Sequence, residues 1–212
     1  MYLSRLILNP RNAGARRDAA RPYELHRTLV RILNGALRDE RLLFRIEPEA
    51  GMGGPVVLVQ TDTTPPDWEP LLKNGYLLRA DGPKPFTPSL ARGVRLRFRL
   101  VANPVKRING KRIPLIFAMH ADEQVKTYTD WLGRQAERWG FRVLEVRDAP
   151  FRTASNRTKL PAYEKHEIPH FGVRFDGLLE VVDPELLSSA LRRGIGPAKA
   201  FGFGLLSLAP AS

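Results

Sequence analysis

The residues best suited to chemistry in this chain are Tyr23 and His26, which lie three positions apart. On a helix this spacing puts both side chains on one side, so a phenol and an imidazole can face the same group. An imidazole titrates near neutral pH and can accept or donate a proton. The neighbouring arginines could hold a phosphate beside the ring, namely Arg16, Arg17, Arg21 and Arg27. The pattern favours proton transfer on a bound phosphate, and a histidine at the edge of a core is the alternative.

The composition limits the other chemistry that is available. The chain has no cysteine, which excludes disulfides, thiolate zinc sites and a cysteine nucleophile. His166 and His170 have a spacing that can chelate a metal on a helix, but Pro169 argues against a helix there. His120 precedes a predicted helix and is interpreted as a capping or surface residue. We therefore expect no metal and no cofactor.

The segment RRGIGPAKAFGFG, residues 192 to 204, is the most distinctive in the chain. Its glycines let the backbone approach a ligand closely, and exposed amides beside basic side chains can form an anion cradle. It lacks the GK[ST] of a Walker loop, and a helix rather than a strand precedes it, which excludes a Rossmann turn. A tight connection from helix to strand is the alternative. The candidate binding residues are Arg193, Gly194, Gly196, Lys199, Gly202 and Gly204.

Two further segments concentrate positive charge. Residues 91 to 112 contain eight basic residues and no acid, namely Arg92, Arg95, Arg97, Arg99, Lys106, Arg107, Lys111 and Arg112. A merely solvated surface would normally mix the two signs, so this segment indicates a surface that tracks phosphates. The second segment, residues 152 to 165, could contact the phosphates of a double-stranded RNA stem or form a surface loop without that role. Its basic residues include Arg152, Arg157, Lys159 and Lys165.

The charge of the whole chain agrees with a polyanionic partner. Its 212 residues carry a net charge of +12, and 26 of the 34 basic residues are arginine. Arginine suits phosphate because its donors form a planar fork, although the codon usage of a GC-rich genome would also favour it. No apolar run approaches the roughly 18 residues of a membrane span. We expect a cytoplasmic protein without a membrane partner.

Hydrophobic periodicity predicts the elements that must position these residues. In the first half we expect a strand at 2–8, a basic loop at 11–21, a helix at 22–34, strands at 41–47 and 55–61, a short helix at 67–72 and a strand near 76. Leu25, Leu29, Ile32 and Leu33 should form the buried stripe of the first helix. The order βαββαβ is that of the ferredoxin-like split motif.

The second half repeats this order with an inserted hairpin. We expect a strand at 94–100, a hairpin turn at Asn109 and Gly110, a helix at 122–139, strands at 141–146 and 171–182, a helix at 184–193 and a strand at 205–208. The predicted fold is α+β, with two tandem ferredoxin-like (RRM-like) domains, each a four-stranded antiparallel sheet backed by helices. The predicted boundaries are 1–82 for the first domain, 83–91 for a proline-rich linker and 92–212 for the second domain.

Several segments in the same order resemble one protein family. They are LNPR at 8–11, RPYELHRTL at 21–29, LRFRLVANPVKR at 96–107 and RRGIGPAKAFGFGLLS at 192–207. Together they resemble the CasE (Cse3) family of CRISPR repeat-processing endoribonucleases over nearly the whole chain.

The resemblance implies a protein that binds the stem-loop of CRISPR repeat RNA, cleaves it on the 3′ side of the stem and stays bound as a subunit of the Cascade complex. Family members need no metal, because the 2′-hydroxyl attacks the adjacent phosphate and leaves a 2′,3′-cyclic phosphate and a 5′-hydroxyl. The family's catalytic residues match His26 and Tyr23, the glycine-rich ending matches its RNA-contacting loop, and the basic segment after 150 matches its stem-binding hairpin. A third, charge-stabilising residue is not placed.

Two other interpretations remain open at this stage. A non-catalytic RNA-binding subunit with the same double fold would show the same charge and glycine pattern. A nucleic-acid-binding module unrelated to CRISPR would show no preference for a repeat hairpin.

Overall fold

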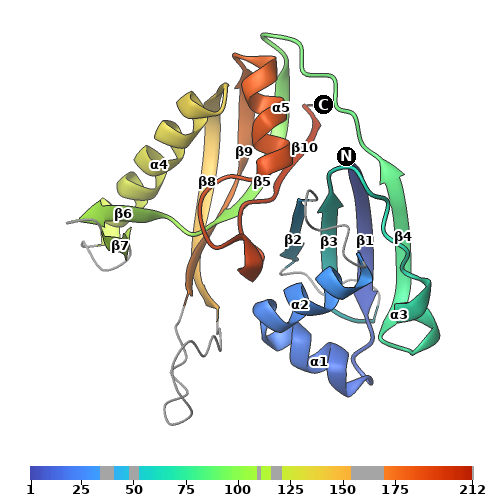
Figure 1. Cartoon of the computed structure of the whole chain (residues 1–212). Helices are drawn as coiled ribbons and strands as arrows, with labels where there is room; N and C mark the ends of the chain where they lie inside the picture. Colours follow the sequence, from blue (N-terminus) through green and yellow to red (C-terminus); the bar gives the residue numbers. More distant parts are fainter. Residues whose placement is uncertain (34–40, 48–52, 109–110, 116–120, 154–169, 212) are drawn as a thin grey trace. The chain divides into compact units, whose positions relative to one another are not determined.

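The computed structural model describes residues 1–33, 41–47, 53–108, 111–115, 121–153 and 170–211. Two compact units make up the described chain (Figure 1). The first comprises Met1–Thr87 in its described part, together with Lys199–Gly202. The second comprises Pro88–Thr153, His170–Ala198 and residues 203–211. A short piece near the C-terminus therefore packs with the first unit, although we placed it in the second domain from the sequence.

The first unit contains one antiparallel sheet with the strand order β2-β3-β1-β4. Its elements are β1 (Tyr2–Leu8), α1 (Ala13–Ala20), α2 (Pro22–Ile32), β2 (Leu42–Ile46), β3 (Val56–Thr61), α3 (Glu69–Lys73) and β4 (Leu77–Pro85). The two central strands, β1 and β3, are neighbours, as the ferredoxin-like motif requires. Since β4 reaches Pro85, the first residues of the predicted linker belong to a strand.

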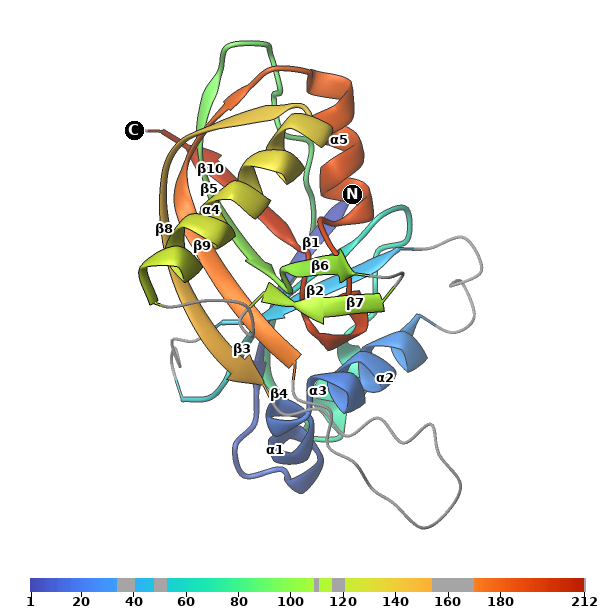
Figure 2. The ribbon, with the colours of Figure 1, turned by 90° about the vertical axis from the view of Figure 1, so that its left-hand side faces the viewer.

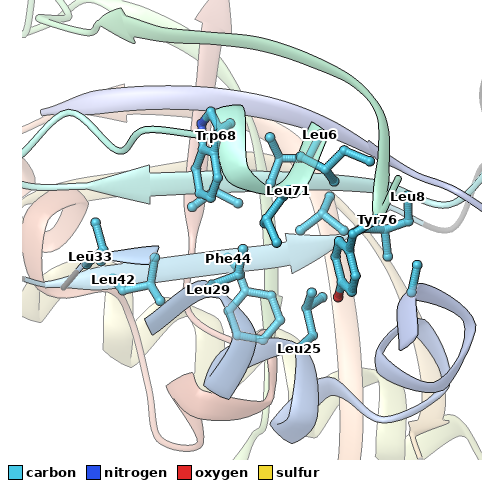
Figure 3. Close-up of a cluster of buried hydrophobic side chains, with 14 residues drawn as sticks. Leu6, Leu8, Leu25, Leu29, Leu33, Leu42, Phe44, Trp68, Leu71 and Tyr76 are labelled. Carbon is cyan, nitrogen blue, oxygen red and sulfur yellow. The ribbon is translucent and has the colours of Figure 1, made fainter. Parts of the chain in front are cut away.

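A hydrophobic core joins the helices of this unit to its sheet (Figure 3). Leu25 and Leu29 of α2 are fully buried, one helical turn apart, and pack with Phe44 of β2. Leu33 is also buried and Ile32 partly so, which confirms the stripe predicted for this helix. The apolar face of α2 thus fixes which side of the helix remains available for chemistry.

The structure corrects the basic loop expected at 11–21, most of which is the helix α1. Asn12 caps its start, because the side-chain oxygen accepts a hydrogen bond from the Ala15 amide at 3.0 Å. Half of the eight helical residues are alanine, the best helix former, and Ala15 packs into the core. The arginines led to the prediction of a basic loop, whereas the alanines and the N-cap residue favour a helix.

The second unit repeats the same sheet order, here β10-β5-β9-β8. Its elements are β5 (Arg95–Ala102), β6 (Val105–Ile108), β7 (Lys111–Pro114), α4 (Ala121–Arg138), β8 (Phe141–Thr153), β9 (His170–Val181), α5 (Pro184–Arg193) and β10 (Leu206–Pro210). In Figure 2, α4 runs across the face formed by β8 and β9, where Trp131 stacks on Phe175 at 6.1 Å between ring centroids. The predicted pair of four-stranded α+β sheets is confirmed.

Two details of this unit differ from expectation or extend it. The strand expected to end at Val146 continues to Thr153, because β8 pairs with β9 as far as Thr153 and His170. Asp148 and Pro150 are poor strand formers, so this pairing was not visible in the local sequence. The inserted hairpin β6–β7 forms a small sheet of its own, and its turn residues lie outside the described part of the chain.

The cap of α1 can be tested directly. Replacing Asn12 with alanine leaves the Ala15 amide without its side-chain acceptor, and we expect the free energy of unfolding to fall by about 0.5–2 kcal/mol. Urea denaturation followed by circular dichroism measures the change. The Asn12→Asp variant keeps an acceptor and should retain the stability of the wild type, so an equal loss in both variants would contradict this role for the cap.

Candidate active site

Tyr23 and His26 lie side by side on α2, with ring centroids 6.3 Å apart and ring planes at 13°. The same-side arrangement predicted from their spacing is therefore present. The Tyr23 ring also stacks on Phe201 at 5.4 Å, and the His26 ring lies 6.2 Å from that of Phe44. The candidate site is thus an aromatic cluster supplied by α2, by β2 and by the short 3-10 helix Lys199–Phe201.

The local sequence explains why the two side chains stay accessible. Pro22 occupies the first turn of α2, where its missing N–H costs nothing. Leu25 and Leu29 turn into the core, and this leaves Tyr23 and His26 half-buried at the edge of the buried face. A substrate can reach both rings without displacing the core.

Burial lowers the pKa of His26 below its ordinary value of 6.5. The charged imidazolium loses more hydration energy in this position than the neutral ring does. Phe44, its close neighbour, is fully buried and offers the ring no charge. His26 is therefore predominantly neutral at neutral pH and able to accept a proton.

Most of the arginines expected around His26 have partners within the protein. Arg17 pairs with Asp18, its Nη2 lying 2.7 Å from Oδ1, and Arg27 pairs with Glu24 at 3.2 Å. One guanidinium nitrogen of Arg16 donates to the backbone carbonyls of residues 10 and 11. Arg21 is exposed and has no side-chain partner among the described residues, so it is the arginine of this group most available to a phosphate.

Asp18 is a residue of this region that the sequence analysis missed. Its carboxylate is completely buried and accepts hydrogen bonds from the Thr28 hydroxyl at 2.6 Å and the Tyr76 hydroxyl at 2.8 Å. Burial and the bond to Asp18 together raise the pKa of Tyr76 far above its usual range. The signal in the sequence was a lone acid inside a basic segment, but its partners come from distant positions.

The glycine-rich ending is divided between the two units. Lys199 and Gly202 pack with the first unit, where a Cβ on Gly202 would lie 3.2 Å from the Phe44 ring. Gly202 also has a φ of +82°, so both its backbone and its neighbour favour glycine. Arg193, Gly194, Gly196 and Gly204 belong to the second unit.

Three amides of this ending, expected as part of an anion cradle, are engaged within the chain. The N–H groups of Gly194, Gly202 and Gly204 donate to the backbone carbonyls of Ala190, Lys199 and Val101. They are therefore used in holding the chain and are not exposed donors. The glycines serve the turn itself, which fits the alternative of a tight connection, and contact of this segment with RNA remains a prediction.

The other predicted binding residues are placed less completely. Lys106 is exposed on β6, and Arg107 and Arg112 occupy directly paired positions of the hairpin with Lys111 beside the turn. Arg152 occupies a position on β8 paired with Phe171. Arg157, Lys159 and Lys165, together with His120 and His166, lie outside the described residues.

The basic strand of the second unit is less positive than its sequence suggests. Asp176 of β9 pairs with Arg99 at 2.6 Å and with Arg174 at 2.9 Å. These residues line a groove of about 1020 Å³ that runs over the sheet. The neighbouring strand thus supplies one acid, Asp176, to a segment that has none of its own.

The described part of the chain shows neither a cluster of metal ligands nor a membrane-spanning helix. It holds no group of three or more histidine, cysteine, aspartate or glutamate side chains that could bind a metal ion. None of its helices is long and apolar enough to cross a membrane.

The lowered pKa of His26 predicts how stability depends on pH. The unfolded chain binds a proton at this residue near pH 6.5, whereas the folded chain binds it only at lower pH. Between these values the unfolded state holds more protons, so the stability contributed by neutral His26 is present above pH 6.5 and is lost as the pH falls. Urea denaturation between pH 5 and 8 should show this loss in the wild type and not in His26→Gln, and parallel curves would contradict it.

Comparison with known proteins shows which family this chain belongs to. The family model described as CRISPR associated protein matches residues 1–210. The chain is 48% identical over 221 residues to the CRISPR-associated endoribonuclease Cse3 of Thermus thermophilus, covering 99% of this chain and 100% of that protein. It is 30% identical over 226 residues to the CRISPR system Cascade subunit CasE of Escherichia coli, again covering 99% and 100%.

Solved structures agree in fold. A CRISPR endoribonuclease Cse3 bound to a 19-nucleotide RNA has a TM-score of 0.86 and 46% identity, and the comparison covers 99% of this chain and 100% of that one. Thermus thermophilus Cse3 bound to an RNA representing a pre-cleavage complex has a TM-score of 0.82 and 46% identity, with 99% and 98% covered. This chain therefore belongs to the CasE (Cse3) family of CRISPR-associated proteins.

Proposed function

We propose that this protein is a CRISPR-associated endoribonuclease that binds the hairpin of repeat RNA, cleaves the precursor on the 3′ side of the stem and remains bound as a subunit of Cascade. The observation that carries the proposal is the Tyr23–His26 pair on α2, half-buried and beside Phe201. The relatives with endoribonuclease and Cascade subunit in their names align over 99% of this chain. The cytoplasm, where precursor RNA is made, is the compartment that suits this function.

The proposed reaction is an intramolecular transfer at one phosphate. The 2′-hydroxyl loses its proton and attacks the adjacent phosphorus, the bond to the 5′-oxygen breaks, and that oxygen gains a proton. The products are a 2′,3′-cyclic phosphate and a 5′-hydroxyl. Because one proton leaves and one arrives, an acid and a base at the site suffice, and we propose that no metal takes part.

Burial of His26 favours one assignment of these two roles. Its neutral ring can take the proton of the 2′-hydroxyl directly, since the lowered pKa keeps it uncharged at neutral pH. The Tyr23 phenol, stacked beside it, carries a proton that it can donate to the leaving 5′-oxygen. Arg21, exposed just before α2, is placed to offset the charge of the phosphate.

RNA affinity is assigned to the basic elements outside the aromatic cluster. We propose that the hairpin β6–β7, Arg152 and the basic residues up to Lys165 contact the phosphates of the stem, and that Arg193 and Lys199 contact RNA near the glycine-rich ending. The hairpin supports this because four of its positions are basic, with Arg107 and Arg112 directly paired. A polyanion would neutralise this concentration of positive charge.

Cleavage by active-site variants tests the reaction. The substrate is the hairpin repeat RNA from the same genome, in EDTA, with the protein in excess and the product ends identified. We expect the wild type to leave a cyclic phosphate, His26→Ala to lose about 10²–10⁴-fold in rate and Tyr23→Phe to lose a comparable factor, because each supplies one proton transfer. Both variants should bind RNA with unchanged affinity.

Either of two results would contradict the assignment. Undiminished cutting by His26→Ala would place the catalyst at another residue. Tight binding of the hairpin by a wild type that never cuts would support the non-catalytic subunit instead.

The salt dependence of binding tests the proposed phosphate contact at the hairpin. Lys106→Gln should reduce the slope of the logarithm of the binding constant against that of the salt concentration by about 0.9, the value for one duplex phosphate contact. Lys73→Gln is the matched control, since this lysine is also exposed but pairs with Glu69 on α3. An equal effect of both substitutions would indicate that only the total charge matters.

A further inference from the structure

Asp18 is the most completely buried charged side chain described near the candidate active site, with none of its surface exposed. Burying a carboxylate costs several kcal/mol unless strong donors replace water. One oxygen, Oδ1, receives the guanidinium of Arg17 at 2.7–2.8 Å. The other, Oδ2, receives two hydroxyl groups, from Thr28 and Tyr76.

These donors come from different elements and converge on one atom. Asp18 belongs to α1, Thr28 to α2, and Tyr76 directly precedes β4 in the segment after α3. Figure 3 shows the Tyr76 ring inside the hydrophobic core with its hydroxyl directed toward the helices. The backbone carbonyl of Asp18 also accepts the Arg21 amide at 3.1 Å, which forms the corner between α1 and α2. Asp18 thus connects both helices to the sheet.

Packing also holds the start of α2, where Pro22 is buried and Tyr23 stacks on Phe201. Its N-cap residue, Arg21, makes no side-chain capping hydrogen bond. Leu25 and Leu29 hold the helix against the sheet, but apolar contacts tolerate small rotations about the helix axis, whereas hydrogen bonds are directional. Thr28 lies two residues after His26, about 200° around the helix, so the bond to Asp18 holds the side of α2 roughly opposite the imidazole.

A small rotation of α2 would matter for the chemistry. A side-chain tip about 5–6 Å from the helix axis moves by about 1 Å when the helix turns by about 10°. A displacement of that size can cost about 100-fold in rate, because proton transfer requires hydrogen-bond geometry.

We propose that Asp18 is a positioning residue: its buried carboxylate holds α2, through the Thr28 hydroxyl, in the rotation that presents Tyr23 and His26 to the phosphate. The proposal rests on the endoribonuclease function proposed above. Asp18 touches neither RNA nor the reacting atoms in this role. It acts through the helix that carries the two catalytic side chains.

A matched pair of variants separates positioning from stability. Thr28→Val and Tyr76→Phe each remove one hydroxyl donor from the same oxygen with almost no change of shape. Both should lower the midpoint of urea unfolding, but only Thr28 lies on α2. We expect the single-turnover cleavage rate of saturated protein to fall at least tenfold in Thr28→Val and to stay within about twofold in Tyr76→Phe. The Kd for the RNA hairpin should be unchanged in both, and Thr28→Ser should restore the rate.

Other outcomes would overturn the proposal. Equal rate losses in Thr28→Val and Tyr76→Phe would mean that Asp18 only stabilises the fold. A normal rate in Thr28→Val would show that the orientation of α2 does not depend on the Thr28–Asp18 hydrogen bond. If the wild type itself does not cleave, the proposed function fails separately. In that case the nuclear Overhauser effects between the His26 and Phe44 rings decide whether Thr28→Val, and not Tyr76→Phe, changes the orientation of α2.

Discussion

The packing of α2 against the first sheet is the constraint on which the candidate active site depends. Leu25 and Leu29 are completely buried in the core and leave one edge of the helix for Tyr23 and His26. The same burial that anchors the helix also partly dehydrates His26 and lowers its pKa. Packing therefore sets both the location of the imidazole and its charge, so the chemistry of this site cannot be separated from the stability of the unit that carries it.

The backbone of the glycine-rich ending meets a different requirement. Its backbone passes close to Phe44, and its Phe201 ring stacks on Tyr23. The φ of +82° at Gly202 allows the backbone to take this course. The amides of three of its glycines are consumed by backbone hydrogen bonds. Ala198 adopts a φ of +63°, where a side chain is disfavoured, so this path is held at some cost by its surroundings. Any contact with RNA then has to come from side chains such as Lys199 or from amides other than these three.

The elements that could be predicted from the sequence are those whose evidence is local. The buried stripe of α2 and the repeated βαββαβ order both follow from hydrophobic periodicity and turn signals. The helix α1 was missed because charge outweighed alanine content in reading residues 11–21. The role of Asp18 could not be inferred, since its partner Tyr76 lies 58 positions away in the sequence.

Partners from distant positions also decide which positive charges of this chain are available to RNA. The net charge of +12 counts every arginine equally, yet Arg17, Arg27, Arg99 and Arg174 each pair with an acid. In such an ion pair the protein's own carboxylate neutralises the guanidinium, so little of its charge is available to a phosphate. We therefore propose that RNA is recognised by the smaller set of cations that the fold leaves without an acid, such as Arg21 before α2. Composition indicates a polyanionic partner, but only the three-dimensional pairing selects the residues that can meet it.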